Sequence, residues 1–113
     1  MVEISTKIKY VFDLDGTLCT NTDGKYHLAE PLLTNVEKVN SLFEEGCEII
    51  IFTARGMNTF NNDINMVYSV YFDFTKKQLE DWGIKYHRLI LGKPSADFYI
   101  DDKGYNVIDF FVQ

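Results

Sequence analysis

Two acidic residues separated by one position follow the first apolar run of the chain. The pentapeptide DLDGT places Asp13 and Asp15 directly after residues 8–12. If a strand continues through these positions, the two carboxylates point to the same side. Gly16 allows a sharp turn that directs backbone N–H groups toward a bound anion. The pattern is typical of a site that binds metal and phosphate together, although an ordinary surface turn uses the same residue types.

A second acidic pair, Asp101 and Asp102, follows the short apolar run at residues 98–100. If this pair lies beside DLDGT, several carboxylates share one pocket, and two carboxylates about 4 Å apart repel by roughly 4 kcal/mol at an effective dielectric constant of about 20. Such a pocket needs a cation. Oxygen ligands with open coordination positions favour Mg²⁺ over zinc. The alternative is that the acidic pair only opens a turn toward Lys103.

Three other polar residues come after predicted strands and suit a phosphate ligand. Lys93, in GKPSAD, can stabilise phosphoryl oxygens as a point charge. Arg55 can donate two parallel hydrogen bonds to a phosphate or a carboxylate, and Thr53 can donate from its hydroxyl. Taken singly, Lys93 is more typical of a solvated loop, Arg55 of a surface charge, and Thr53 of a strand-end hydroxyl bonded to nearby backbone.

Apolar runs and turn residues predict the elements that position these side chains. We expect two helices, from about Pro31 to Gly46 and from about residue 62 to residue 82, with a break near residues 74–75. The expected strands are residues 8–12, 48–52, 84–91, 98–100 and 106–110.

Strands that alternate with helices predict an α/β fold of three layers, Rossmann-like, with a mainly parallel five-stranded sheet. Ligands of such sheets bind beyond the carboxyl ends of the strands. We therefore expect Asp13, Thr53 and Asp101 to meet at one edge of the sheet.

Length and charge restrict the classes of protein that the sequence fits. With 113 residues, of which 46% are hydrophobic, the sequence predicts one domain over residues 1–113. The net charge of −6 comes without a basic cluster, which argues against nucleic acid and against an anionic membrane surface as partners.

The N-terminal residues and the cysteines predict a cytoplasmic protein. Glu3, Lys7 and Lys9 interrupt the apolar stretch that a signal peptide needs. No apolar run approaches the roughly 20 residues of a membrane span. Cys19 and Cys47 belong to no metal-binding or redox spacing, so we expect them to be reduced thiols.

In combination, these motifs resemble the haloacid dehalogenase (HAD) superfamily of phosphatases. The resemblance spans residues 7–104 and is most specific to the small members that act in capsular or surface polysaccharide biosynthesis. Its motifs, in chain order, are DLDGT, EIIIFTAR, GKPSAD and FYIDD.

The resemblance implies a covalent mechanism. Asp13 would attack phosphorus and form an aspartyl phosphate, while Asp15 would protonate the leaving oxygen and then accept a proton from the hydrolytic water. Thr53 and Lys93 would bind and stabilise the phosphoryl group. The acid role requires Asp15 to carry a proton when substrate binds.

The resemblance also implies a magnesium site. Mg²⁺ would be held by the Asp13 side chain, the Asp15 carbonyl and Asp101, with Asp102 bonded to a metal ligand or a metal-bound water.

Larger relatives carry a cap domain, for which this chain has no room, so the resemblance implies a HAD-like domain without a folded cap. Cover for the site would then come from a flap at residues 20–28, from the loop at residues 57–63, or from a neighbouring subunit in a homo-oligomer. The aromatic residues Tyr68, Tyr71, Phe72 and Phe74 fit either an ordinary core or such an interface.

These observations predict a Mg²⁺-dependent phosphomonoesterase that acts on a sugar phosphate or a related polysaccharide precursor. One alternative is a nucleotide or polynucleotide-end phosphatase, although the acidic charge argues against a polynucleotide. The other is a non-catalytic HAD-fold binding or regulatory module, which would have no need of an acid–base residue at Asp15.

Overall fold

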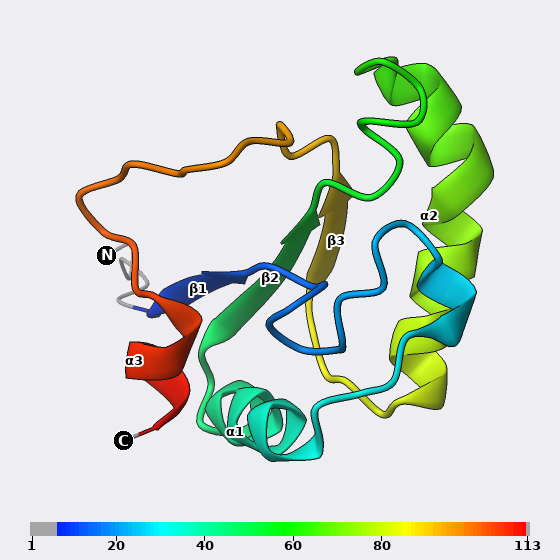
Figure 1. The fold of residues 1–113 in the computed structure, drawn as a ribbon. Coiled ribbons are helices and arrows are strands. Elements are labelled where there is room, and N and C mark those ends of the chain that lie inside the picture. The colour runs from blue at the N-terminus through cyan, green and yellow to red at the C-terminus, as the bar shows by residue number, and fades with distance from the viewer. Residues whose placement is uncertain (1–6, 113) are drawn as a thin grey trace, which may run out of the picture.

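A parallel β-sheet forms the centre of the fold in the computed structural model, which describes residues 7–112 (Figure 1). The strands are β1 (Lys9–Phe12), β2 (Glu48–Thr53) and β3 (Arg88–Leu91), hydrogen-bonded in the order β1-β2-β3. Because Phe12 lies opposite Ile51, β2 continues past the end of β1. Alternate side chains of β2 are buried, as expected for the central strand of a sheet that helices cover.

Two long helices confirm the helical periodicity of the sequence. α1 (Leu33–Glu44) is followed by Gly46, whose φ of +94° suits the left-handed position after a helix. α2 (Ile64–Asp81) begins after Asp63, whose side chain accepts a hydrogen bond from a backbone N–H of the first turn. It runs without a break to Asp81, so the expected break near residues 74–75 is wrong, and Gly83, with a φ of +69°, follows its end.

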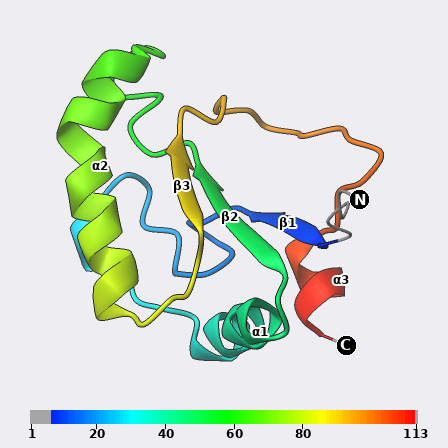
Figure 2. The same cartoon turned by 180° about the vertical axis from the view of Figure 1, so that it is seen from behind.

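Two short helical segments complete the fold. α3 (Val107–Phe111) packs on β1, where the ring of Phe110 lies 5.9 Å from that of Tyr10 and 5.6 Å from that of Phe12. The other is the 3-10 turn η1 (Tyr26–Leu28), which belongs to the flap. Figure 2 shows α2 beside β3 and α3 on the opposite side of the sheet, beside β1.

Buried side chains from the sheet and both long helices form the core. A smaller cluster around Met57, Val67 and Leu91 packs against Tyr68, Tyr71 and Phe72. These aromatic residues therefore contribute to the core, while Phe74 stays 36% exposed. The main cluster contains Phe12, Leu14, Leu18, Cys19, Ala29, Val36, Val39, Ile49, Ile51, Leu79 and Ile84. Cys19 and Cys47 are free thiols, as expected.

The prediction of a five-stranded, Rossmann-like (HAD-like) sheet is wrong, because the described residues form a sheet of three strands. Residues 98–100 form no strand: the connection from β3 to α3 arches away from β1 in both views (Figures 1 and 2), and no strand of the described sheet pairs with these three residues. Phe98 and Ile100 are accordingly 84% and 98% exposed. An apolar run becomes a strand only when another strand accepts and donates its hydrogen bonds.

The predicted last strand, residues 106–110, is also wrong, since most of it belongs to α3. The Asn106 side chain accepts a hydrogen bond from the Ile108 N–H, which starts a helix. Among the helices of residues 7–112, none combines the length and the apolar character needed to cross a membrane.

Candidate active site

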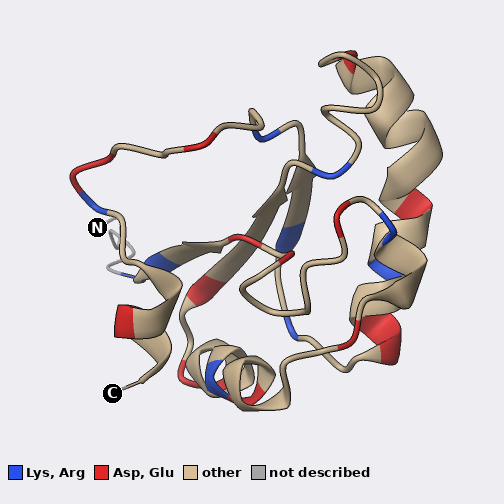
Figure 3. Ribbon diagram, in the orientation of Figure 1, with Lys and Arg blue, Asp and Glu red and all other residues tan. Residues whose placement is uncertain are grey.

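A polar pocket of about 580 Å³ lies at the carboxyl ends of the three strands. Segments far apart in the sequence meet there, and Figure 3 shows acidic and basic residues of these segments near the strand ends. Asp13, Thr53 and Lys93 line the pocket together, because each follows or ends a strand of a parallel sheet. The full lining is Asp13, Asp15, Asn21, Asp23, Gly24, Tyr26, Thr53, Ala54, Arg55, Asn58, Thr59, Lys93, Ser95, Ala96 and Tyr99.

Asp13 and Lys93 form an ion pair that remains accessible from the pocket, which we call the open pair. Lys93 Nζ lies 3.5 Å from Asp13 Oδ1, and the two side chains are 19% and 36% exposed. Thr17 donates a hydrogen bond of 3.3 Å to the other Asp13 oxygen. The ammonium group also lies 4.1 Å from the centre of the Tyr99 ring.

Burial raises the pKa of Asp13 above its ordinary value of 3.8. The positive charge of Lys93 opposes this shift, while the negative charge of Asp15 adds to it. The ionised form of Asp13 therefore depends on Lys93 for part of its stabilisation.

Asp15 and Arg55 form a second ion pair with different geometry, which we call the closed pair. Arg55 Nε donates to Asp15 Oδ2 and Nη2 donates to Asp15 Oδ1, both at 2.9 Å. The Arg55 side chain is completely buried and that of Asp15 is 18% exposed. Two parallel hydrogen bonds of this kind fix the plane of the carboxylate as well as its charge.

Two residues of α2 hold the other end of the Arg55 guanidinium. Nη1 donates to Gln78 Oε1 at 2.6 Å and to Thr75 Oγ1 at 3.3 Å. Thr75 is fully buried, so its hydroxyl accepts a hydrogen bond where water cannot supply one.

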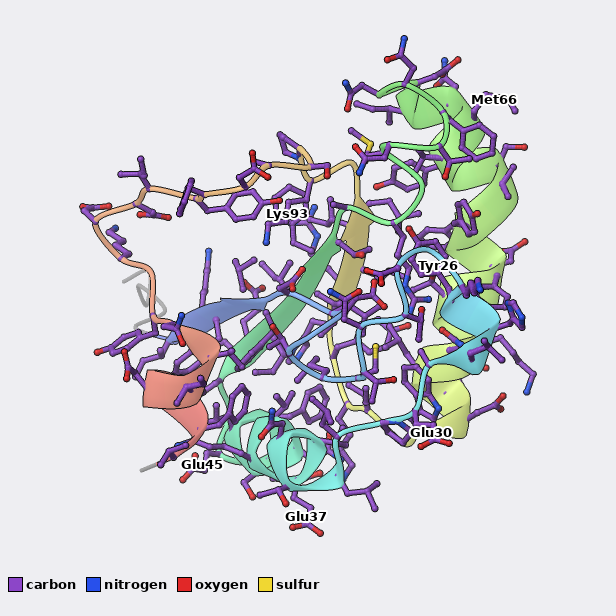
Figure 4. The ribbon with its side chains drawn as sticks, in the orientation of Figure 1. Tyr26, Glu30, Glu37, Glu45, Met66 and Lys93 are labelled. Atoms are coloured by element: carbon purple, nitrogen blue, oxygen red, sulfur yellow. The ribbon has the colours of Figure 1, made fainter. Side chains whose placement is uncertain are left out.

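The flap, residues 20–28, is attached to this network through Tyr26. Gln78 Nε2 donates to the Tyr26 carbonyl at 2.7 Å, and the Gly56 N–H donates to the Tyr26 hydroxyl at 3.0 Å. The Tyr26 ring lies over the guanidinium of Arg55, 4.7 Å from its carbon atom. Figure 4 shows Tyr26 in the flap, beside α2, and Lys93 near the carboxyl end of β2. The flap therefore covers the closed pair and leaves the open pair accessible.

Thr53 lies at the base of the pocket and connects β2 to both pairs. Its Oγ1 accepts a hydrogen bond of 3.2 Å from the Arg55 N–H, and its carbonyl accepts one of 3.1 Å from the Lys93 N–H. A hydroxyl that accepts one hydrogen bond can still donate its own proton. Thr53 can therefore donate to an anion in the pocket.

The acidic pair Asp101 and Asp102 lies on the exposed connection between β3 and α3, outside the pocket lining. Asp101 Oδ1 accepts a hydrogen bond of 2.9 Å from the Lys103 N–H, and this contact lowers the pKa of Asp101. In this arrangement the pocket gathers Asp13 and Asp15 without Asp101.

The oxygen donors of the pocket can be compared with the magnesium site that the resemblance implies. Asp13 offers its carboxylate and Asp15 also lines the pocket, but Asp101, whose carboxylate is the third expected ligand, lies outside it. Within residues 7–112, no three acidic, histidine or cysteine side chains are close enough together to hold a metal ion. The described arrangement therefore does not fit the expected three-residue Mg²⁺ site, and we derive no catalytic step through the metal.

Sequence analysis did not identify the residues that hold Arg55. Thr75 and Gln78 lie three positions apart on α2, and therefore on one face of the helix, next to the buried Leu79. Polar residues within the apolar stripe of a helix are the signal that points to such a role. The contribution of Tyr26 has no comparable signal, because it depends on the course of the flap.

Neither a comparison with protein-family models nor one with curated proteins found a match for this chain. The chain is similar to a solved structure, the crystal structure of a structural-genomics target from Vibrio cholerae. The two are 28% identical with a TM-score of 0.87, and the match covers 94% of this chain and 89% of that one. The course of the backbone over most of this chain is therefore similar to that of a crystallised protein.

Proposed function

We propose that this protein is a phosphomonoesterase that forms an aspartyl phosphate on Asp13, the chemistry that the HAD resemblance implies. The open pair is the observation that carries the proposal. It places an accessible carboxylate 3.5 Å from an ammonium group, in a polar pocket at the carboxyl ends of parallel strands. An anionic nucleophile can approach an anionic phosphate only where positive charge offsets the repulsion between them.

In the first step, an ionised oxygen of Asp13 attacks phosphorus as the bond from phosphorus to the leaving oxygen breaks. Lys93 offsets the charge of the phosphoryl oxygens, and the Thr53 hydroxyl donates a hydrogen bond to one of them. A leaving oxygen that is not stable as an anion takes a proton from a water molecule, whereas a stable one such as p-nitrophenolate leaves as the anion. The product is a phosphoryl group bonded to Asp13.

In the second step, water attacks the phosphorus atom of this intermediate. Asp15 accepts the proton of the water, the bond from phosphorus to Asp13 breaks, and inorganic phosphate leaves. Asp13 and Asp15, two residues apart after β1, both line this pocket, which supports the roles of nucleophile and base that we assign to them.

The outer lining of the pocket supports a sugar phosphate or a related polysaccharide precursor as the substrate. Neutral hydrogen-bonding side chains from three segments line the same pocket as the open pair: Asn21, Asn58, Thr59 and Ser95. Amides and hydroxyls of this kind suit a leaving group that carries several hydroxyls. With this substrate class we retain the cytoplasmic location expected from the N-terminal residues.

Release of p-nitrophenol from p-nitrophenyl phosphate tests the proposal. Asp13→Asn should lower turnover at least about a thousand-fold, because the amide is not a nucleophile. Asp73→Asn, an exposed position on α2 outside the pocket, is the matched control and should stay within about twofold of the wild type. Equal turnover in Asp13→Asn and the wild type would remove Asp13 as the nucleophile.

The same assay addresses substrate and metal. A panel of sugar phosphates and nucleoside monophosphates, ranked by kcat/KM, separates the sugar proposal from a nucleotide phosphatase. Assays with EDTA and with added Mg²⁺ test the magnesium requirement that the resemblance implies. A requirement for Mg²⁺, together with lost turnover in Asp101→Asn, would mean that the connection between β3 and α3 takes another course in the active enzyme.

A further inference from the structure

Every N–H donor of the Arg55 guanidinium group has an acceptor within the protein. An arginine side chain has five N–H donors. The Nε donor and one Nη2 donor bind Asp15, both Nη1 donors bind residues of α2, and the remaining Nη2 donor faces Cys19 Sγ at 3.7 Å. The side chain is also completely buried. No donor is left for a phosphate in the pocket.

We propose that Arg55 is a positioning residue that acts on the reaction through Asp15, in place of the substrate-binding role expected from the sequence. This inference rests on the proposed phosphatase activity. The fork of two hydrogen bonds sets where the Asp15 carboxylate lies in the pocket and which of its lone pairs remain open to a water molecule.

The hydrogen bonds at Asp15 also define its chemical role. Each carboxylate oxygen accepts a hydrogen bond from Arg55, and Oδ1 accepts a second from the Cys19 thiol at 3.4 Å. All three of these groups donate to Asp15, so in this geometry its carboxylate acts as an acceptor, which is what a general base requires. The closed pair therefore prepares Asp15 for the second step, the hydrolysis of the aspartyl phosphate.

Gln78 fixes the guanidinium in this orientation. Its side-chain oxygen accepts from Arg55, and its side-chain nitrogen donates to the Tyr26 carbonyl of the flap. The base is thus connected through Arg55 and Gln78 to both α2 and the flap. A lysine at position 55 would keep the charge but could not form the planar fork.

The leaving group of p-nitrophenyl phosphate allows the two steps to be separated. p-Nitrophenolate leaves as an anion without a proton, so formation of the intermediate does not need Asp15. Its hydrolysis does, because the attacking water transfers a proton to Asp15 as the bond from phosphorus to Asp13 breaks. A misplaced Asp15 therefore slows the second step alone, and phosphorylated protein accumulates.

The experiment measures turnover of p-nitrophenyl phosphate and, after acid quench, the phosphorylated fraction of the chain by intact-protein mass spectrometry. Arg55→Lys should lower kcat about 10- to 100-fold and raise the phosphorylated fraction above that of the wild type. Adding Arg55→Lys to Asp15→Asn should change kcat by less than about twofold, because a residue that acts only through Asp15 has no further effect once the base is gone. Lys76→Gln, at an exposed position of α2, is the control.

A second variant covers the case in which Arg55→Lys fails to fold, as judged by circular dichroism. Gln78→Met has nearly the same volume and leaves the fork of Arg55 and Asp15 in place, but it removes the acceptor that orients Arg55. It should show the same accumulation of phosphorylated protein in weaker form.

Three results would overturn the inference while leaving the phosphatase proposal standing. The first is a kcat of the double variant that is lowered by the product of the two single effects. The second is a raised KM with unchanged kcat in Arg55→Lys. The third is that no phosphorylated protein accumulates in Arg55→Lys or in Gln78→Met. By contrast, a wild-type protein that releases no p-nitrophenol would contradict the proposed function itself.

Discussion

The two ion pairs of the pocket differ in the burial of the cation, in the distance between the charged groups and in the number of hydrogen bonds. In the closed pair, a fully buried guanidinium binds Asp15 through two hydrogen bonds of 2.9 Å. In the open pair, a flexible ammonium lies 3.5 Å from Asp13, and both groups are partly exposed. The two acidic residues are separated by only one position in the sequence.

The difference indicates which carboxylate is free to react. A bidentate pair whose guanidinium is completely buried holds one geometry, because breaking it would leave a buried charge without a partner. A partly exposed lysine pair is weak and can exchange its partner for a ligand. The closed pair is therefore suited to orient a base, and the open pair to take up a phosphoryl group.

The largest expected effect is on stability, when the cation of each pair is replaced by methionine. Arg55→Met should lower the free energy of unfolding by about 3 kcal/mol, since it leaves Asp15, Gln78 and Thr75 without their shared donor. Lys93→Met should change it by no more than about 1 kcal/mol. Urea unfolding followed by circular dichroism measures both values, and equal losses in the two variants would contradict the distinction between the pairs.

The open pair should determine the pH dependence of catalysis. Asp13 must be ionised to attack, and burial raises its pKa above 3.8, so kcat/KM should increase with pH along a limb that lies above pH 3.8. Lys93 lowers this pKa. Lys93→Met should therefore move the limb to higher pH and reduce kcat/KM on the plateau by about tenfold.

Initial rates of p-nitrophenol release between acid and neutral pH measure this limb. Lys103→Met, on the exposed connection outside the pocket, is the matched control and should leave the limb in place. A limb that stays in place in Lys93→Met would show that Asp13 does not depend on the open pair.

The smallest expected effect comes from the contact that attaches the flap to the closed pair. Tyr26→Phe keeps the ring over Arg55 but removes the hydroxyl that accepts from the buried Gly56 N–H. The free energy of unfolding should fall by about 1 kcal/mol, the usual effect of leaving a buried donor without its acceptor. Urea unfolding measures the change, and a variant as stable as the wild type would mean that water replaces the hydroxyl.

The local sequence pattern predicted the two long helices, whose backbone hydrogen bonds join residues only four positions apart. The apolar stripe of α1, ended by Gly46, and that of α2, ended by Gly83, both correspond to helices in the structure. The thiols of Cys19 and Cys47 are free, as their spacing indicated.

The sequence pattern gave wrong predictions for the last two strands, because a strand forms only when another strand, often distant in the sequence, pairs with it. Residues 98–100 have the composition of a strand, yet no strand of the described sheet pairs with them. Residues 106–110 likewise have strand-forming composition, but the side chain of Asn106 starts α3 there. Composition expresses a preference for extended backbone, and it carries no information on whether a second strand is within reach.

The sequence by itself determined that Asp13, Thr53 and Lys93 come together, because residues that follow parallel strands must share one edge of the sheet. Only the tertiary structure decided that Arg55 is buried on Asp15, that Gln78 and Tyr26 hold it there, and that Asp101 lies outside the pocket. The physical reason is that connection rules make the strands parallel and so direct their carboxyl ends to one edge, whereas the partner of a buried guanidinium is set by the packing of α2 and the flap against the sheet.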